Sequence, residues 1–405
     1  MAAALLVATG LPVAAGAIGA PATAAPPGST PPVAQGLDPS SRASVLQAYQ
    51  QQWVPAARTT TGWTGSTSPC VPGTDTAKAQ AATLTAVNFA RGLVGRKAVT
   101  MDATLSAAAM KAALISQANN SLNHQPPSTA ACWTQAGADA SGASNLYGVS
   151  TTPAYAATPI ESYLDDPGAS NTFAAHRRWI LFSRLTKVGS GTTTGANALY
   201  VIDPTSWLKT VSTKVSAWPS AGYFPASLEP GGRWSLSVPN ADFSAATVTV
   251  KQGTTVLPTT VTSRTVTGYG DNTLVWSVDP RYDISRGDIA YTVAVTGYTV
   301  GGVSKTTKYT TTLFDATVGL TDRHVISFPF PKAKRTGVTF DPGATDSRGL
   351  TVYYYSDTPG VCTASQNPNR VTTVAPGTCS IGAFVPHDNR YPDAPTETRT
   401  FTVVG

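Results

Sequence analysis

Side chains that could carry chemistry are few in this sequence, which has four histidines and four cysteines among 405 residues. The cysteines show no C-x-x-C spacing, so a structural zinc site built from them is disfavoured. An even number of cysteines is typical of disulfides, and four of them allow three connectivities. The spacing does not select one. We expect Cys70 to pair with Cys132 and Cys362 with Cys379, because each bridge then stays within one compositional segment.

The charge balance limits the possible partners. The chain has 28 Lys and Arg against 22 Asp and Glu, a net charge of +6 and a pI of about 9.1. No run of Lys or Arg concentrates this excess, so a nucleic-acid partner is not expected. A diffuse positive charge is compatible with weak attraction to anionic cell-wall polymers or lipid headgroups, and equally with a role in solubility.

The N-terminal 25 residues are expected to be a secretory signal. Residues 1–20 form an uncharged apolar run, and Ala22 and Ala24 offer an A-x-A-like cleavage site. No later stretch approaches the roughly 20 apolar residues of a membrane span, so we expect export with no transmembrane segment after the signal. Residues 26–41 are rich in Pro, Gly and Ser and are expected to form an extended linker.

Helical patterns dominate residues 42–208. A helix is predicted from Thr76 to Leu93, and another begins after Asp102, whose side chain can cap it. Apolar residues of this second helix recur at i, i+3, i+4, i+7 and i+10, which predicts one buried face. His124 should fall at or just beyond its C-terminal end.

Two further helices carry most of the remaining polar candidates. The first is predicted to start at Thr158, with Glu161 closing a capping box, so capping is sufficient to explain that carboxylate. It should stop before Asp166-Pro-Gly, and the next helix carries His176. Residues 185–203 then contain two short strands around a Gly-rich turn, which predicts a hairpin.

Short runs of Val, Thr, Tyr and Ser alternate from Thr210 onward and predict two β-sandwich modules, at residues 209–316 and 317–405. Neither contains paired carboxylates, a nucleophile or a histidine cluster with catalytic spacing. Trp218, Tyr223 and Phe224 could stack on sugars if exposed, although aromatic residues in a sandwich usually fill its core.

Several motifs keep one order and rough spacing between Leu84 and Asp203. They are the Asn-x-x-Arg of the first long helix, the isolated His124, the Asn145-Leu146 pair, and His-Arg-Arg-Trp from His176. This series resembles the CAP superfamily of cysteine-rich secretory, antigen five and pathogenesis-related proteins, in its exported bacterial branch. The resemblance implies an α-β-α sandwich for residues 42–208.

The C-terminal segment has a resemblance of its own. Its order of motifs, from Ser-Asp-Thr-Pro-Gly-Val-Cys at Ser356 to Gly-Thr-Cys-Ser-Ile at Gly377, is similar to bacterial immunoglobulin-like repeats of cell-surface proteins. The segment before it looks like a β module that accompanies such CAP domains. The expected fold class is therefore α+β, a CAP sandwich followed by two all-β immunoglobulin-like modules.

The CAP resemblance implies a cleft lined by two histidines and two acidic residues, which in several members bind a divalent metal. By motif position His124 and His176 correspond to the histidines, and Asp166 to one acid, with Asp165 as a close substitute. These three positions form the implied metal site, and zinc or calcium is the candidate ion. Two imidazoles and one carboxylate can hold zinc in an open site.

The other acid of the family falls on Ser144, because the chain reads Ala-Ser-Asn-Leu at the family's Gly-Glu-Asn-Leu motif. Ser144 and its neighbour Asn145 are therefore candidates for the cleft. Ser144 could act as a nucleophile only with a base such as His124 within hydrogen-bond reach, and no G-x-S-x-G elbow surrounds it. Ala175 replaces the glycine that normally precedes the second histidine.

Three functions follow as hypotheses, and whether the protein is an enzyme stays open. The first is a secreted, extracellular or wall-associated binding protein whose cleft holds a ligand, which the family resemblance suggests to be a lipid or sterol. The second is a hydrolase in which a metal held by His124, His176 and Asp166 activates water. The third is a structural cell-wall protein that holds an anionic polymer.

Overall fold

The computed structural model describes residues 37–149, 153–168, 170–208, 214–280, 287–320, 324–329, 333–366, 368–385 and 396–405. The expected signal at residues 1–25 and the linker up to residue 36 lie outside the described residues. No helix in the described ranges is long and apolar enough to cross a membrane.

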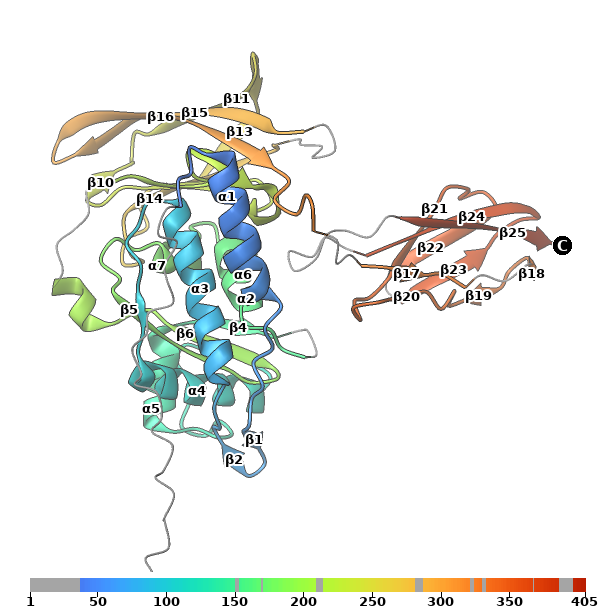
Figure 1. Ribbon diagram of the computed structural model, residues 1–405, viewed down its shortest axis with the longest axis horizontal. Coiled ribbons are helices and arrows are strands. Elements are labelled where there is room, and N and C mark those ends of the chain that lie inside the picture. Colours follow the sequence, from blue (N-terminus) through green and yellow to red (C-terminus); the bar gives the residue numbers. More distant parts are fainter. Residues whose placement is uncertain are drawn as a thin grey trace, which may run out of the picture. The chain divides into compact units, whose positions relative to one another are not determined.

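The N-terminal region, residues 42–208, begins with a continuous helical stretch. Helix α1 (Arg42–Ala48) passes through a π-helical turn, η1 (Tyr49–Trp53), into α2 (Val54–Ala57). This stretch lies along α3 (Ala77–Leu93), where Tyr49 and Trp53 pack on Phe89 with ring centroids 6.1 and 5.7 Å apart (Figure 1). The predicted start of α3 is confirmed, since the Thr76 hydroxyl accepts a hydrogen bond from the backbone N–H of Ala79.

A four-stranded sheet lies between this helical layer and a second one. Its order is β3 (Thr100–Met101), β5 (Lys187–Thr192), β6 (Ala196–Tyr200) and β4 (Ser144–Gly148), and β5 and β6 form the predicted hairpin. Adjacent residues of β6 face opposite layers. Leu199 belongs to the core shared with α3, whereas Ala198 belongs to the cluster under α4 (Ala103–Ala118). This alternation gives the expected three layers.

Helix α4 packs directly on the sheet. A Cβ at Gly191 would lie 2.3 Å from the backbone of Met110, so only glycine allows this approach. Asp102 caps α4 as predicted, accepting hydrogen bonds from the backbone N–H groups of Thr104 and Leu105. A further helix that the sequence patterns did not predict, α5 (Gln135–Gly142), packs against α4.

The start of α6 (Thr158–Asp165) corrects one prediction. Its N-cap is Ala157 and not Thr158, because the backbone N–H of Glu161 bonds to the carbonyl of Ala157. The first turn therefore starts one residue earlier than the capping box requires, and no side chain caps it. Asp166 ends the helix in the left-handed conformation, with φ 53° and ψ 54°. Helix α7 (Ala175–Ile180) follows.

The middle module, Ser216–Phe314, contains two sheets. The larger has the order β12-β11-β15-β16-β8, with β10 paired to β15, and the smaller has the order β13-β14-β9-β7. The bounds are β7 (Ser216–Trp218), β8 (Gly222–Pro225), β9 (Arg233–Ser237), β10 (Ala241–Asp242), β11 (Thr247–Gln252), β12 (Thr255–Leu257), β13 (Thr259–Ser263), β14 (Thr273–Val278), β15 (Ile289–Val300) and β16 (Val303–Phe314). Short 3-10 turns, η2 (Pro204–Leu208) and η3 (Ala226–Leu228), lie before β7 and after β8.

The hydrophobic core is continuous between the N-terminal region and the middle module. One cluster of buried residues includes Phe89 and Trp179 from the first and Trp234 and Trp276 from the second. Trp218 and Phe224 are also buried in this core, which excludes the exposed sugar-stacking role considered for them. The predicted boundary at residues 208 and 209 therefore does not separate two independent cores.

The last module, Ile326–Val404, has a core of its own. Its sheets have the orders β17-β20, β18-β25-β24-β21 and β19-β23-β22. The bounds are β17 (Ile326–Ser327), β18 (Ala333–Arg335), β19 (Thr339–Phe340), β20 (Thr345–Asp346), β21 (Tyr353–Ser356), β22 (Cys362–Gln366), β23 (Asn369–Thr373), β24 (Gly377–Phe384) and β25 (Glu397–Val404). The expected α+β class, a layered region followed by all-β sheets, is confirmed.

Both expected disulfides are present. Cys362–Cys379 joins β22 to β24 inside the core of the last module. Cys70–Cys132 joins the small hairpin of β1 (Ser66–Thr67) and β2 (Cys70–Val71) to the segment before α5. Each bridge lies within one compositional segment, as predicted.

Candidate functional site

The junction between α6 and α7 brings together two of the predicted site residues, His176 and Asp166. Nδ1 of His176 lies 2.7 Å from Oδ1 of Asp166. The other carboxylate oxygen accepts hydrogen bonds from the backbone N–H groups of His176, at 3.0 Å, and Arg177, at 3.3 Å. The carboxylate thus holds both the imidazole and the first turn of α7. The Asp166 side chain is 0% exposed and that of His176 is 31% exposed.

Neighbouring elements fix the orientation of the imidazole. The ring of Tyr163 lies against it, with centroids 5.5 Å apart and planes inclined by 33°. The Tyr163 hydroxyl donates to Oδ1 of Asn197 at 2.8 Å, which anchors that ring to the sheet. Asn145 Nδ2 donates to the carbonyl oxygen of His176 at 3.0 Å. With Nδ1 engaged by Asp166, Nε2 is the ring nitrogen left for solvent or a ligand.

The other two predicted site residues do not join this pair. His124 is exposed, and its Nδ1 lies 2.8 Å from the carbonyl oxygen of Ser141. Ser144 is buried in β4, and its hydroxyl has no hydrogen-bond partner among the described residues, so none of them acts on it as a base.

The residues do not fit the metal site that the family resemblance implied. Oδ1 of Asp166 accepts from Asn171 Nδ2 and faces His176 Nδ1, while Oδ2 accepts two backbone N–H groups. A carboxylate used in this way has little capacity left for a cation. Within the described ranges, no group of three or more His, Cys, Asp and Glu is arranged to hold a metal ion.

Two arginines join the site to the middle module. Arg177, which is buried, donates through Nη1 to the carbonyl oxygen of Arg233 at 2.8 Å and to the Ser235 hydroxyl at 3.1 Å. Arg233 in turn donates to the carbonyl oxygens of Asp166 and Gly168. Burial lowers the pKa of Arg177 to about 10, so it stays charged at neutral pH. Strand β9 therefore holds the loop that carries Asp166.

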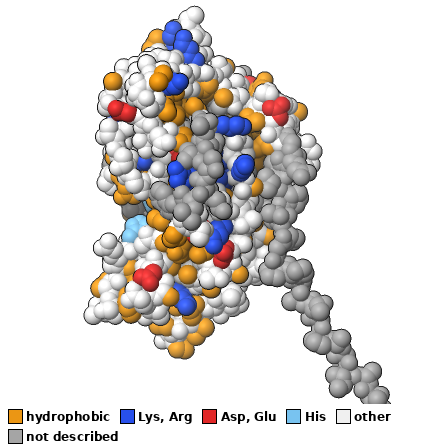
Figure 2. All heavy atoms as spheres, turned by 90° about the vertical axis from the view of Figure 1, so that its left-hand side faces the viewer, with side chains coloured by type: hydrophobic (Ala, Val, Ile, Leu, Met, Phe, Trp, Pro, Cys, Tyr) orange, Lys and Arg blue, Asp and Glu red, His pale blue; other side chains and the backbone are white. Residues whose placement is uncertain are grey.

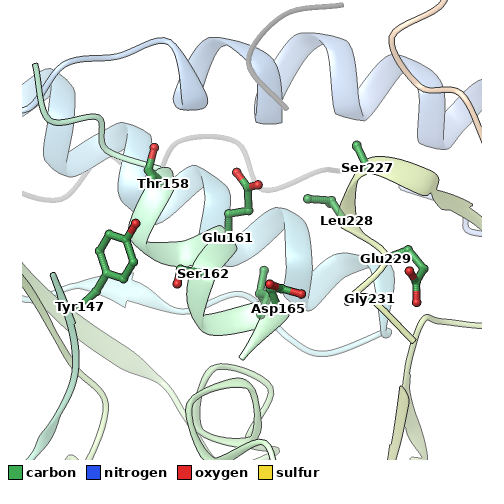
Figure 3. Close-up of a pocket in the computed structure, with 10 residues that line it drawn as sticks. Tyr147, Thr158, Glu161, Ser162, Asp165, Ser227, Leu228, Glu229 and Gly231 are labelled. Atoms are coloured by element: carbon green, nitrogen blue, oxygen red, sulfur yellow. The ribbon is translucent and has the colours of Figure 1, made fainter. Parts of the chain in front are cut away.

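A cavity of about 410 Å³ lies between α6 and the segment that links η3 to β9 (Figure 3). Asp165, the residue before Asp166, forms part of its wall. Its surface is about equally polar and apolar, and its lining comprises Tyr147, Thr158, Glu161, Ser162, Leu164, Asp165, Ser227, Leu228, Glu229 and Gly231.

Two of the lining carboxylates are partly buried. Burial raises the pKa of Asp165, although the positive charges of Arg177 and Arg233 act in the opposite direction. Burial also raises the pKa of Glu229, and the negative charge of Asp165 adds to that effect. Oε1 of Glu229 accepts hydrogen bonds from Trp234 Nε1, at 2.6 Å, and from the backbone N–H of Gly232, at 2.8 Å.

The sequence patterns did not identify this cavity. Glu229 follows a strand of the middle module, and no motif connects it to α6. The sequence motifs explain Glu161 by helix capping and Asp165 only as a substitute for Asp166. The positions of Glu161, Asp165 and Glu229 in the sequence do not indicate that the three side chains line the same cavity.

The family model for CAP, the cysteine-rich secretory protein family, matches residues 84–207. That range contains the four layered strands as well as His124, Asn145, Asp166 and His176. The chain therefore contains a CAP domain. The matched range of the CAP domain begins within α3 and ends within η2, so α1, α2 and both β modules lie outside it.

Matches to solved structures are weaker. The chain is similar to a C-terminal 282-residue fragment of intimin in complex with the intimin-binding domain of its translocated receptor, at 15% identity over 47% of this chain and 64% of that fragment, with a TM-score of 0.16. It is also similar to the protocadherin γB4 extracellular domain, at 14% identity over 47% and 32%, with a TM-score of 0.18. It is similar as well to mouse cadherin-23 EC22–24, at 13% identity over 47% of this chain and 66% of that chain, with a TM-score of 0.15. Likenesses at this level establish no function. No curated protein matches the chain.

Proposed function

We propose that this protein is an extracellular binding protein that holds a small molecule between its CAP domain and the middle module. The observation that carries the proposal is the cavity of about 410 Å³ beside the His176–Asp166 pair. Ligand pockets typically enclose about 300–1,000 Å³ and combine apolar walls with a few polar groups. The two disulfides support an oxidising, extracellular environment.

The lining of the cavity favours a polar ligand over the lipid or sterol that the family resemblance suggested. The lining includes two leucines and the ring of Tyr147, but three of its side chains carry carboxylates and three others, besides Tyr147, carry hydroxyl groups. An aliphatic chain or a sterol nucleus would desolvate these groups without replacing their hydrogen bonds to water, which is costly.

The hydrolase hypothesis has less support. The His176–Asp166 pair could move a proton, but within the described residues neither a partnered nucleophile nor a three-residue metal set accompanies it. General acid–base catalysis also needs a positioned reacting group within hydrogen-bond reach.

One observation favours a second candidate, attachment to an anionic wall polymer. Lys and Arg side chains gather near the middle of the face shown in Figure 2. Retention on the polymer that falls steeply with added salt, and that survives His124→Ala and His176→Ala together, would support attachment. Retention that does not change with salt would exclude an electrostatic role for this face.

A cavity-filling substitution tests the binding proposal. Thermal unfolding of the wild type, of Ser162→Trp and of a control, Ser244→Trp on the exposed surface, would be compared with glucose, glucosamine, lysine, palmitate or cholesterol present. A ligand of the folded state raises the unfolding temperature. We expect a polar probe to stabilise the wild type and the control but not Ser162→Trp. Stabilisation of Ser162→Trp to the same extent, or of no protein by any probe, would contradict the proposal.

A further inference from the structure

The cavity contains two carboxylates that lack a positive partner. No side-chain or backbone group in the described residues donates a hydrogen bond to the Asp165 carboxylate, and Glu229 accepts hydrogen bonds only through Oε1. In Figure 3 the two side chains come from opposite walls, Asp165 from α6 and Glu229 from the segment before β9. Both side chains line the cavity and are partly buried, and the Asp165 carboxylate and Oε2 of Glu229 receive no hydrogen bond from the described residues.

The two arginines nearby do not neutralise them by contact. Arg177 uses its donors on the carbonyl oxygens of Leu164, Asp165 and Arg233 and on the Ser235 hydroxyl. Arg233 uses its donors on carbonyl oxygens of the loop after α6. The positive charges of the two arginines lower the pKa of Asp165, but burial raises it by more.

We propose that the cavity binds an organic cation through a primary ammonium group, which the carboxylates of Asp165 and Glu229 hold between them. This inference rests on the proposed binding function and specifies its ligand class. An ammonium group has three N–H donors and no acceptor, and an ionised carboxylate has only acceptors, so the two kinds of group are complementary. A cation that enters this space can bond directly to the two carboxylates, to which Arg177 and Arg233 donate no hydrogen bond.

The remaining lining indicates what the rest of the ligand is like. Glu161 adds a third carboxylate to the wall. Hydroxyl groups of Tyr147, Thr158, Ser162 and Ser227 can bond to a hydroxylated body. A bare metal ion is a poorer match, because about 410 Å³ far exceeds the space that one ion occupies. An amino sugar combines the ammonium group with hydroxyls at a suitable size.

Calorimetric titration with matched probes tests the inference. The ammonium probes are glucosamine and 1,4-diaminobutane, and their neutral counterparts are glucose, N-acetylglucosamine and 1,4-butanediol. We expect at least one ammonium probe to bind the wild-type protein about 30-fold or more tightly than its neutral counterpart, since hydrogen bonds between charged groups are the strongest that the cavity offers. This comparison needs no variant, so it holds whatever a substitution does to folding.

Substitutions then locate the interaction. Asp165→Asn with Glu229→Gln removes both charges and keeps both shapes, and Asp139→Asn, on the exposed surface of α5, is the matched control. We expect the double variant to lose about 30-fold or more in affinity for the ammonium probe and the control to lose none. Glutamine at position 229 can still accept the hydrogen bonds of Trp234 Nε1 and of the Gly232 N–H, and thermal unfolding of the double variant checks that it folds.

The possible failures separate the two proposals. Equal or tighter binding of a neutral counterpart, abolished by Ser162→Trp, would overturn the ammonium inference and leave the binding function in place. Ammonium binding that the double variant retains would also overturn it. If neither ammonium probe binds the wild type, the inference is wrong, and the thermal comparison of Ser162→Trp with Ser244→Trp decides the binding function separately.

Discussion

Two His–Asp pairs of similar geometry lie in different regions of this molecule. In the CAP domain, His176 and Asp166 are 2.7 Å apart and the imidazole is 31% exposed. In the last module, Nδ1 of His324 lies 2.9 Å from both carboxylate oxygens of Asp346, and the two side chains are 1% and 0% exposed. The comparison teaches that the pairing itself does not make a site. Access to solvent and a neighbouring cavity distinguish the first pair from the second.

The same two regions differ in how they are held together. The CAP domain and the middle module share one core, and buried arginines of α7 bond to backbone carbonyls across the junction. The last module relies on a smaller core of its own that contains the Cys362–Cys379 bridge. Sharing a core allows two segments far apart in sequence to form one cavity wall. We therefore expect the first two regions to unfold together and the last module to unfold separately.

The largest effect is expected from Trp276→Ala in β14. Trp276 is fully buried in the shared core, and such a truncation costs about 3–5 kcal/mol. Hydrogen exchange should show that α3 loses protection along with β14, although α3 belongs to the other region. Phe401→Ala in the last module is the control and should leave α3 unchanged. Full protection of α3 in Trp276→Ala would contradict a cooperative shared core.

The next effect concerns the bridge of the last module. Replacing Cys362 and Cys379 by Ala opens a loop with a sequence separation of 17, for which chain entropy gives a loss of about 3 kcal/mol. Calorimetry should show a lower unfolding temperature for the last module alone. A comparable shift in the transition of the CAP domain and middle module would show that the regions are coupled.

A comparable effect depends on pH and belongs to the N-terminal region, residues 42–208. Burial raises the pKa of Asp75 to about 7, and Oδ1 of its carboxyl group has no partner. The folded state therefore binds a proton that the unfolded state releases near pH 4, so stability should fall as pH rises from about 4 to about 7. We expect a loss of about 3 kcal/mol over this range.

Asp75→Asn should flatten that dependence, since an amide does not titrate. Its oxygen can still accept from the backbone N–H of Thr192 and from Gln80 Nε2, as Oδ2 of Asp75 does. Urea unfolding of both proteins at a series of pH values checks this. Equal slopes with pH in the two proteins would assign the dependence to another group.

The smallest effect is expected at an exposed ion pair between α1 and the middle module. Arg42 Nε lies 2.8 Å from Asp288 Oδ2, with side chains 36% and 31% exposed. Surface pairs contribute about 0–1 kcal/mol. Arg42→Ala should therefore change the unfolding free energy by less than about 1 kcal/mol in a urea titration. A loss of several kcal/mol would mean that this pair, and not the shared core, joins α1 to the middle module.

Much of the fold could be predicted because its signals are local. The cap at Asp102, the start of α3 after Thr76 and the hairpin of β5 and β6 depend on neighbouring residues. The helix α5 was missed because its sequence, Gln-Ala-Gly-Ala-Asp-Ala-Ser-Gly, carries no apolar periodicity. The prediction that Thr158 is the N-cap was wrong, because the Thr-x-x-Glu motif does not determine which residue begins the helix.

The site was predictable only in part, for the same reason. His176 contacts both Asp166 and Asn145, and the three residues lie on elements of one domain. Glu229 approaches α6 through the packing of two separate regions, and no pattern in the sequence encodes that approach. The cavity and its set of lining side chains exist only when the CAP domain and the middle module pack on each other.

The most direct test of the central claim is a crystal structure of the protein with glucosamine bound. The account predicts that the sugar lies between α6 and the segment before β9, with its ammonium nitrogen within hydrogen-bond distance of the carboxylates of Asp165 and Glu229. A sugar bound elsewhere, or bound in the cavity with its ammonium group turned away from both carboxylates, would contradict it.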